Sequence, residues 1–325
     1  MISIGPRWRR SKKLNMRRSF ISALTELAAH DPRIVLLTGD LGFTVLEPFR
    51  DRFPERFFNV GVAEQNMIGV AAGLAEAGRL PFVYSMSTFL TMRGYEFIRN
   101  GVVGHKFPVR LIGVGAGFDY SKEGMTHYAL EDVGLLRMQP DLSLFMPADG
   151  EQAKTILQAT WNDPGPVYYR LGKDEQRIVP GLQGAFEKDK PACIRKGSDL
   201  LILALGEMAY EAAELADFLS KDHSISCHIL VVSHLAQPPS EGWTKSLSAF
   251  DSVVTLESHY ASGALGSMIA ERIADHGLRC RLLRAGVKNA WDGKCGDRSF
   301  MMDQYQISPK SLVDPCRQLV KRNPR

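Results

Sequence analysis

Short runs of apolar residues alternate, in the first half of the chain, with segments in which apolar residues recur every three or four positions. A short apolar run bounded by turn residues is typical of a buried strand, and the recurring pattern is typical of a helix. The expected strands cover residues 34–37, 81–85, 109–114, 142–146 and 167–170, and the expected helices cover residues 16–30, 66–77, 89–105, 128–138 and 150–161. This alternation predicts a mostly parallel sheet with helices on both faces.

The second half repeats the pattern after a polar interruption. Residues 174–198 are polar and contain Pro180, Gly181 and Gly184, so we interpret them as a linker. Beyond them, strands are expected over 200–205, 226–232, 252–256 and 279–283, with a helix over 208–219. The expected fold class is therefore α/β, with two doubly wound domains at 16–173 and 199–325, and residues 1–15 as a mobile basic tail.

Composition agrees with a soluble globular protein of two domains. The chain has 325 residues, of which 45% are apolar and 23% charged, values ordinary for a globular protein. The longest strongly apolar run, at 200–205, is too short to span a bilayer, and the basic N-terminal residues lack the apolar stretch of a secretory signal. No cysteine pair has C-x-x-C or zinc spacing. Reduced thiols in the cytoplasm are the simplest interpretation.

The positive net charge comes from one end of the chain. Residues 1–18 carry seven basic residues and no acid, so the net charge of +4 leaves 4 − 7 = −3 for the remainder. No basic surface with interleaved aromatic residues follows this arm. We therefore expect neither a nucleic acid nor a membrane as a partner.

The stretch at residues 59–75 combines a carboxylate with an almost wholly apolar helix. From Met67 onward the residues are small and apolar, which predicts a helix buried on every side, and Glu64 stands at its beginning. Glutamate is rarely buried without a partner. The residues alone leave two interpretations: a first-turn glutamate stabilised by the helix dipole, or a functional carboxylate. The spacing of Gly69 and Gly73 predicts close packing against a neighbouring surface, for which a subunit interface is a candidate.

This stretch resembles the one that opens the key helix of the pyrimidine-binding domain in the transketolase family of thiamine diphosphate enzymes. The segment from Thr255 to Ser267 is similar to the turn before a glycine-led helix in the same family's C-terminal domain. The resemblance covers roughly residues 16–318. It implies that Glu64 is catalytic and binds the cofactor, because the family's glutamate contacts N1′ of the aminopyrimidine and so helps the cofactor lose its C2 proton.

Two further segments resemble cofactor contacts of the family. Ser87-Thr88-Phe89-Leu90 is similar to the segment that stacks on the aminopyrimidine, which makes Phe89 the candidate. This chain has one or two extra residues here, so Met92, Tyr95 and Phe97 all remain candidates for the second aromatic position. Gly39-Asp40-Leu41 resembles the family's turn near the thiazolium, which implies that Asp40 binds the cofactor.

Other segments resemble the family's substrate contacts. Gly124-Met125-Thr126-His127 is similar to the segment whose histidine contacts the reacting carbons of the sugar, so His127 is expected to be catalytic and to bind substrate. Arg17, Thr44 and Arg170 stand where the family binds the substrate phosphate.

Two positions depart from the family and affect its expected specificity. Glu123 replaces an aspartate that contacts a sugar hydroxyl, and the family's phosphate histidine falls near Gly115, in a glycine-rich loop. Both changes suggest a sugar that differs in length, branching or terminal anion. We therefore expect a specialised transketolase of a dedicated pathway.

An absence completes the comparison. The family holds Mg²⁺ and the diphosphate with a Gly-Asp-Gly segment, and both Gly39-Asp40-Leu41 and Gly296-Asp297-Arg298 lack the second glycine. The diphosphate-binding domain and Mg²⁺ are therefore expected on an N-terminal partner subunit, with self-association of this chain inside a heterotetramer.

The resulting prediction is a subunit that, with its partner, transfers a two-carbon ketol unit between sugar phosphates or related sugars. Three alternatives stay open. The chain could belong to a 1-deoxyxylulose-5-phosphate synthase-like enzyme, since Arg93 and Tyr95 after the Phe89 segment also resemble that enzyme. It could instead be a 2-oxoacid decarboxylase beta-like subunit. The third alternative is a non-catalytic assembly subunit.

Overall fold

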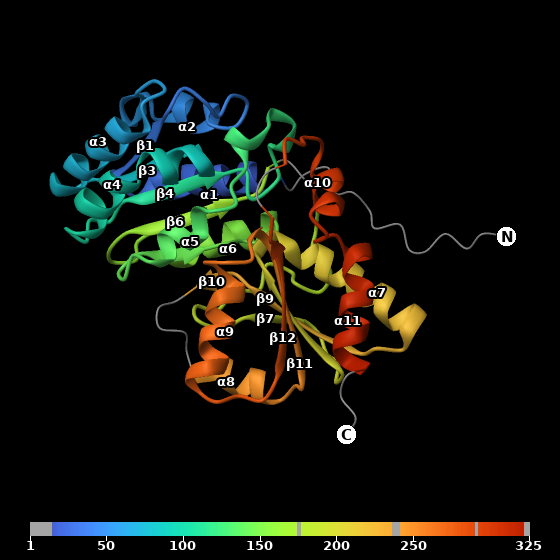
Figure 1. Ribbon diagram of the computed structural model, residues 1–325. Coiled ribbons are helices and arrows are strands. Elements are labelled where there is room, and N and C mark those ends of the chain that lie inside the picture. Colours follow the sequence, from blue (N-terminus) through green and yellow to red (C-terminus); the bar gives the residue numbers. More distant parts are fainter. Residues whose placement is uncertain (1–14, 174–176, 236–240, 290–291, 322–325) are drawn as a thin grey trace.

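The computed structural model describes residues 15–173, 177–235, 241–289 and 292–321, and it contains two sheets (Figure 1). The first sheet has seven strands in the order β10-β5-β6-β4-β3-β1-β2, and the second has five in the order β12-β11-β8-β9-β7. All neighbouring strands are parallel except β10 against β5 and β7 against β9. Figure 1 shows the blue-to-green half above and the yellow-to-red half below. The α/β fold with two mostly parallel sheets is as predicted.

The first sheet is buried on both faces. Its strands are β1 (Ile34–Thr38), β2 (Phe57–Asn59), β3 (Leu80–Met86), β4 (Arg110–Val114), β5 (Ser143–Phe145), β6 (Val167–Leu171) and β10 (His234–Leu235). Ile34 and Leu36 pack on one side with residues of the helices α1, α2 and α6, whereas Val35 and Leu37 pack on the other with residues of α3 and α5. Strands buried on both faces read as continuous apolar runs, which is why they were visible in the sequence.

Side-chain caps fix where several helices of this half begin. The helices are α1 (Met16–His30), α2 (Glu47–Arg52), α3 (Glu64–Glu76), α4 (Tyr95–Phe97), α5 (Asp132–Arg137) and α6 (Gly150–Thr160). Asn15 accepts the N–H of Arg18 at 3.3 Å ahead of α1, and Asp149 accepts the N–H of Gln152 at 2.9 Å ahead of α6. Such caps satisfy N–H groups that have no partner inside the helix.

The second sheet also has helices on both faces. Its strands are β7 (Ala192–Arg195), β8 (Leu200–Leu205), β9 (Cys227–Val232), β11 (Ser252–Tyr260) and β12 (Arg281–Val287). The helices are α7 (Ala209–His223), α8 (Glu241–Ser248), α9 (Leu265–Asp275), α10 (Arg298–Gln304) and α11 (Pro309–Lys321). Residues of α8 and α9 belong to the same apolar cluster as α3 and α5, so one core continues from the first sheet to the second.

Two short strands connect the halves in a way that the sequence did not indicate. Strand β10 lies beyond β9 in the chain, yet it pairs with β5 of the first sheet, and His234 stacks on Phe145 with ring centroids 4.4 Å apart. Strand β7 lies inside the segment interpreted as a linker and forms the edge of the second sheet. Both strands are too short to produce a readable pattern.

The expected helix over 89–105 is wrong in detail. The structure has π-helical turns at Phe89–Arg93 and Ile98–Val103, separated by the short helix α4. A π turn holds one more residue than an α turn, which agrees with the extra residues expected in this segment. The expected helix over 128–138 begins only at Asp132, because residues 125–127 form a tight turn and Ala129 bridges to Gly117.

Among the described residues, no helix combines the length and apolar character that crossing a membrane requires.

Candidate active site

The candidate site lies at the carboxyl ends of β1, β2 and β3. Parallel strands bring these ends to one edge of a sheet, where α/β proteins bind their ligands. Asp40 follows β1, Glu64 begins the helix after β2, and Phe89 lies just beyond β3. The sheet therefore gathers residues that are widely separated in the chain.

Glu64 is buried at this edge. Its side chain is 2% exposed, its Oε1 accepts a hydrogen bond from the hydroxyl of Ser85 at 3.2 Å, and its Oε2 pairs with Arg93 Nη1 at 3.1 Å. Glu64 is the first residue of α3, where the helix dipole favours a negative charge. The carboxylate is thus held by two side chains from β3 and the segment that follows it.

Phe89 and His127 extend this contact. The guanidinium carbon of Arg93 lies 4.2 Å from the centroid of the Phe89 ring. The rings of Phe89 and His127 meet edge to face, with centroids 5.1 Å apart and planes at 70°. Three of the residues predicted from the sequence are therefore brought together, through an arginine for which no role was predicted.

Asp40 is tied to the loop that leads into α3. Its backbone N–H donates to Asn59 Oδ1 at 3.0 Å, and Asn59 Nδ2 donates back to Asp40 Oδ1 at 2.9 Å. The N–H of Gly61 also donates to Asn59 Oδ1, at 3.1 Å. Asp40 has a φ of 58°, an unusual conformation for a residue other than glycine. Sequence reasoning missed Asn59, which stood at the beginning of the stretch singled out and carried no separate signal.

The other predicted substrate residues lie on the surface. Arg17 is half-buried and donates to the hydroxyl of Tyr120 at 3.5 Å. Thr44 is exposed with a φ of 66°, and its N–H donates to Glu47 Oε1 at 2.8 Å. Glu123 is exposed in the turn before His127. The side chains that hold Glu64 are those of Ser85 and Arg93, so the roles of these three residues stay predictions.

Arg170 lies deeper in the molecule than the other predicted phosphate residues. Its side chain is fully buried, and it bonds to Asp132 at 2.8 Å, Glu207 at 3.1 Å and the carbonyl oxygens of Ala129 and Ser258 at 2.8 and 3.0 Å. These partners come from both halves of the chain. Because carboxylates and carbonyls already surround the guanidinium, Arg170 joins the two halves and does not present itself to a substrate phosphate in this structure.

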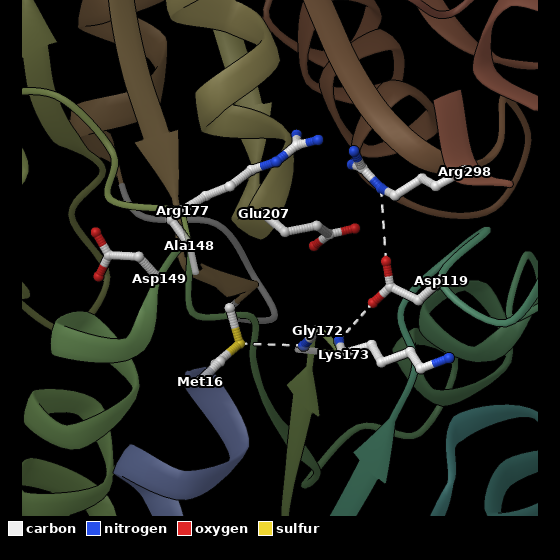
Figure 2. A pocket seen from close by; sticks show the side chains of 9 residues that line it. All are labelled: Met16, Asp119, Ala148, Asp149, Gly172, Lys173, Arg177, Glu207 and Arg298. Atoms are coloured by element: carbon white, nitrogen blue, oxygen red, sulfur yellow. Dashed lines mark hydrogen bonds and ion pairs between the residues drawn. The ribbon is translucent and has the colours of Figure 1, made fainter. Parts of the chain in front are cut away.

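More charged residues surround a small cavity beside Arg170 (Figure 2). The cavity has a volume of about 20 Å³ and is lined by Met16, Asp119, Ala148, Asp149, Gly172, Lys173, Arg177, Glu207 and Arg298. Burial raises the pKa of Glu207 to about 7, against the opposing effect of Arg170. Space of this size holds about one water molecule. The region is therefore a closed ionic contact between the two halves.

A second buried glutamate belongs to the second sheet. Glu257, in β11, accepts the backbone N–H groups of Leu265 and Gly266 at 2.9 and 2.8 Å. Burial raises the pKa of Glu257 to about 7, although these two donors act in the opposite direction. The carboxylate of Glu257 thus accepts two N–H groups in the first turn of α9, and the surrounding chain buries it completely.

The chain is similar to known proteins over most of its length. The sequence profile described as "Transketolase, pyrimidine binding domain" matches residues 12–178, and the one described as "Transketolase, C-terminal domain" matches residues 189–312. A putative transketolase C-terminal section from Methanocaldococcus jannaschii is 34% identical over 94% of this chain and 96% of that protein. The 6-deoxy-6-sulfo-D-fructose transketolase subunit SqwH from Clostridium sp. is 30% identical over 94% of this chain and 95% of that protein.

A solved structure is also similar to this chain in fold. The structure titled "Split gene transketolase, inactive beta4 tetramer" superposes with a TM-score of 0.84 and 31% identity, covering 95% of this chain and 99% of that one.

Proposed function

Because this chain belongs to the transketolase family, we propose that it is the subunit of a split transketolase that carries the pyrimidine-binding and C-terminal domains. With an N-terminal partner, it would transfer a two-carbon ketol unit between sugar phosphates or related sugars. The observation that carries the proposal is the buried carboxylate of Glu64 beside Phe89 and His127, at the edge where α/β sheets bind ligands. The domain limits at 173 and 199, and a cytoplasmic location, remain part of the proposal.

The residues present fit the aminopyrimidine half of thiamine diphosphate. A flat basic ring requires a carboxylate at its ring nitrogen and an aromatic face. Glu64 and half-buried Phe89 can supply these two groups, and both contact the same side chain, that of Arg93. When bound, this cofactor supplies the nucleophilic carbon for bond making and breaking next to a carbonyl. Glu64 would hold a proton between its carboxylate and N1′, while Asp40 would lie toward the thiazolium side.

The described residues contain no group of three or more His, Cys, Asp or Glu side chains able to hold a metal ion. We propose that Mg²⁺ and the diphosphate are bound by the partner, which would carry the Gly-Asp-Gly segment missing from this sequence. The chain's own contribution to substrate would come from His127 at the reacting carbons and from Arg17, Thr44 and Glu123 farther out. Arg170 would act indirectly, by holding the two halves together.

Exposed apolar residues near the candidate site support a partner surface. Phe43 is 74% exposed, Val62 is 70% exposed and Met125 is 50% exposed, and all three lie in loops next to residues of the site. Clustered apolar exposure of this kind is typical of a surface that another chain covers. We propose that these loops contact the N-terminal subunit, and that the complex is a heterotetramer in which this chain also contacts a second copy.

The substrate is proposed to be a sugar other than that of the ordinary pentose pathway. Glu123 and the glycine-rich loop around Gly115 depart from the family, and one relative is named for a sulfonated ketose. A panel of ketose donors and aldose acceptors on wild type and Glu123→Asp tests this. Ordinary preference for xylulose 5-phosphate with ribose 5-phosphate, unmoved by the substitution, would overturn it.

Reconstitution tests the function itself. We expect the purified chain to show no ketol transfer, and the complex with a diphosphate-binding subunit to transfer ketol units from a ketose phosphate in the presence of Mg²⁺ and thiamine diphosphate. Transfer by the isolated chain at a rate unaffected by the partner would refute the split-enzyme proposal. Release of CO₂ from pyruvate would favour the synthase-like or decarboxylase-like alternative, and a complex inactive with every donor would favour the assembly subunit.

A further inference from the structure

The side chain of Arg93 contacts both residues that are proposed to bind the aminopyrimidine ring, Phe89 and Glu64. The guanidinium carbon of Arg93 lies 4.2 Å from the centroid of the Phe89 ring, and its Nη1 is 3.1 Å from Glu64 Oε2. A guanidinium is planar, carries its charge over three nitrogens and donates hydrogen bonds in its plane. Arg93 therefore uses the same aromatic face and the same carboxylate that an aminopyrimidine would need.

Local geometry explains why Arg93 reaches this position. Phe89 and Arg93 are the first and last residues of a π-helical turn, so their side chains emerge on the same face. Gly94 follows directly, and a Cβ there would collide with the side chain of Ile68 in α3 and with the carbonyl oxygen of Leu90. The absence of a side chain at Gly94 lets the segment approach α3 closely, and this approach brings Arg93 next to Glu64.

The contact differs from the permanent ion pairs of this protein. Arg170 is fully buried and bonded to acceptors from both halves. The side chain of Arg93 is 50% exposed and, within the part of the chain that the structure describes, forms its ion pair with Glu64. A half-exposed arginine can turn its charged head into water at little cost, because water replaces most of what it loses. Arg93 can therefore move away from this contact, whereas Glu64 and Phe89 are held in place by their burial.

We infer that Arg93 acts as a stand-in for the aminopyrimidine ring in the cofactor-free chain, and that it leaves Phe89 and Glu64 when thiamine diphosphate binds. This inference rests on the proposed function. In the free chain Arg93 would keep the buried carboxylate paired and the ring face covered. Binding would then require the open arrangement, so the measured affinity is reduced by the fraction of chains that are open.

The test compares cofactor affinity in matched variants of the complex with the diphosphate-binding subunit. Thiamine diphosphate is titrated by calorimetry into wild type, Arg93→Gln, Arg93→Lys and the control Arg99→Gln. Arg99 is exposed on the same segment and donates to Asn100, so the control removes one positive charge without touching Glu64. Arg93→Lys keeps the charge but loses the planar group that covers Phe89.

We expect Arg93→Gln to bind thiamine diphosphate about tenfold more tightly than wild type, the scale of one exposed cation–π contact together with one half-exposed ion pair. Arg93→Lys should lie between the two, and Arg99→Gln should match wild type. The gain should shrink in high salt, which screens the ion pair.

Equal or weaker binding by Arg93→Gln, in a complex that binds the cofactor, overturns this inference and leaves the proposed function intact. Weaker binding would identify Arg93 as a contact of the bound cofactor. No binding to any variant at millimolar concentration overturns the proposed function and the inference with it. Circular dichroism and retention of the partner confirm that each variant is folded, and Arg93→Lys gives an independent result should Arg93→Gln fail this check.

Discussion

Glu64 and Glu257 are buried glutamates, one from each half of the chain, that lie close to the beginning of a helix, and their carboxylates are held in different ways. Glu257 is fully buried and accepts the backbone N–H groups of Leu265 and Gly266 in the first turn of α9. Glu64 is 2% exposed and accepts hydrogen bonds from the hydroxyl of Ser85 and from the half-exposed guanidinium of Arg93. Backbone N–H groups hold the carboxylate of Glu257, whereas side chains hold that of Glu64 at an open edge of the first sheet.

This difference agrees with the proposal that Glu64 is a functional carboxylate, whereas Glu257 has a structural role. Four N–H groups at the beginning of every helix lack a partner inside it, and Glu257 satisfies two of them. Glu64 is itself the first residue of α3, and its N-cap residue Ala63 provides no side-chain cap, so no helical N–H is known to use the Glu64 carboxylate. A buried charge costs free energy unless it is paired and hydrogen-bonded, and the partners of Glu64 are a hydroxyl and a half-exposed guanidinium. We propose that the cofactor binds the Glu64 carboxylate from the same open edge.

The largest expected effect is on catalysis through Glu64. Glu64→Gln in the reconstituted complex should lower kcat by roughly 10²-fold or more, because an amide cannot exchange a proton with N1′ as a carboxyl group does. The fold should survive, since the amide keeps the size of the side chain. Proton exchange at C2 of the bound cofactor, followed by NMR, should slow in parallel with kcat.

The matched control is Glu257→Gln in the other sheet. It should lower the free energy of unfolding by about 1–3 kcal/mol, because an amide nitrogen would face the N–H groups of α9, and it should leave C2 exchange close to wild type. Unchanged exchange in Glu64→Gln would mean that another group activates the cofactor.

A pH effect of intermediate size should come from Glu257. Burial raises its pKa to about 7 in the folded chain, with Arg170, Arg284 and the two N–H donors opposing the shift. Between its ordinary value of about 4.3 and that value, the folded state binds more protons than the unfolded state, so stability falls as pH rises. Raising the pH from 5.5 to 6.5 should lower the free energy of unfolding by about 1 kcal/mol through this residue.

The measurement is urea unfolding of wild type and Glu257→Gln at both pH values. Other titrating groups, including Glu207, are present in both proteins and cancel in the difference. A drop of equal size in the variant would show that Glu257 does not titrate in this range.

The sequence predicted most of what depends on local pattern. Nearly continuous apolar runs marked five of the seven strands of the first sheet, all but β2 and β10, and the apolar helix after Glu64 pointed to the candidate site. It could not predict contacts made between distant parts of the chain. Arg170 meets Glu207 and Ser258 across the two halves, and β10 returns to the first sheet from beyond β9. No spacing in the sequence encodes such pairs.

Within the site, the same limit applies at a smaller scale. Resemblance identified Glu64, Phe89 and His127, which the structure brings together. Arg93 and Asn59 received no role, because their importance depends on side-chain direction. For Arg93, that direction follows from a π turn that an α-helical period cannot describe. Arg170 has a residue type that suits phosphate binding, but its burial among carboxylates and carbonyls could not be predicted from the sequence.

The smallest expected effect concerns how the open edge keeps its shape. Asp40 adopts a φ of 58°, a conformation that costs a residue other than glycine roughly 1 kcal/mol or more. Asn59 holds it there with one accepted and one donated hydrogen bond, and also accepts the N–H of Gly61. Asn59→Ala should therefore weaken thiamine diphosphate binding by the complex about three- to fivefold, the scale of one net hydrogen bond.

Because Asn59 is exposed, the free energy of unfolding should change by less than about 0.5 kcal/mol in Asn59→Ala. Asn59→Asp sharpens the test. It keeps an acceptor for the two N–H groups, but it loses the amide donor and sets a second carboxylate against that of Asp40, so it should weaken binding more than the alanine variant does. Asn162→Ala, at an exposed asparagine whose side-chain oxygen accepts a hydrogen bond from Arg33, should bind like wild type. If Asn59→Asp binds the cofactor as well as wild type, Asp40 is not held by Asn59, and the open edge keeps its shape through the backbone alone.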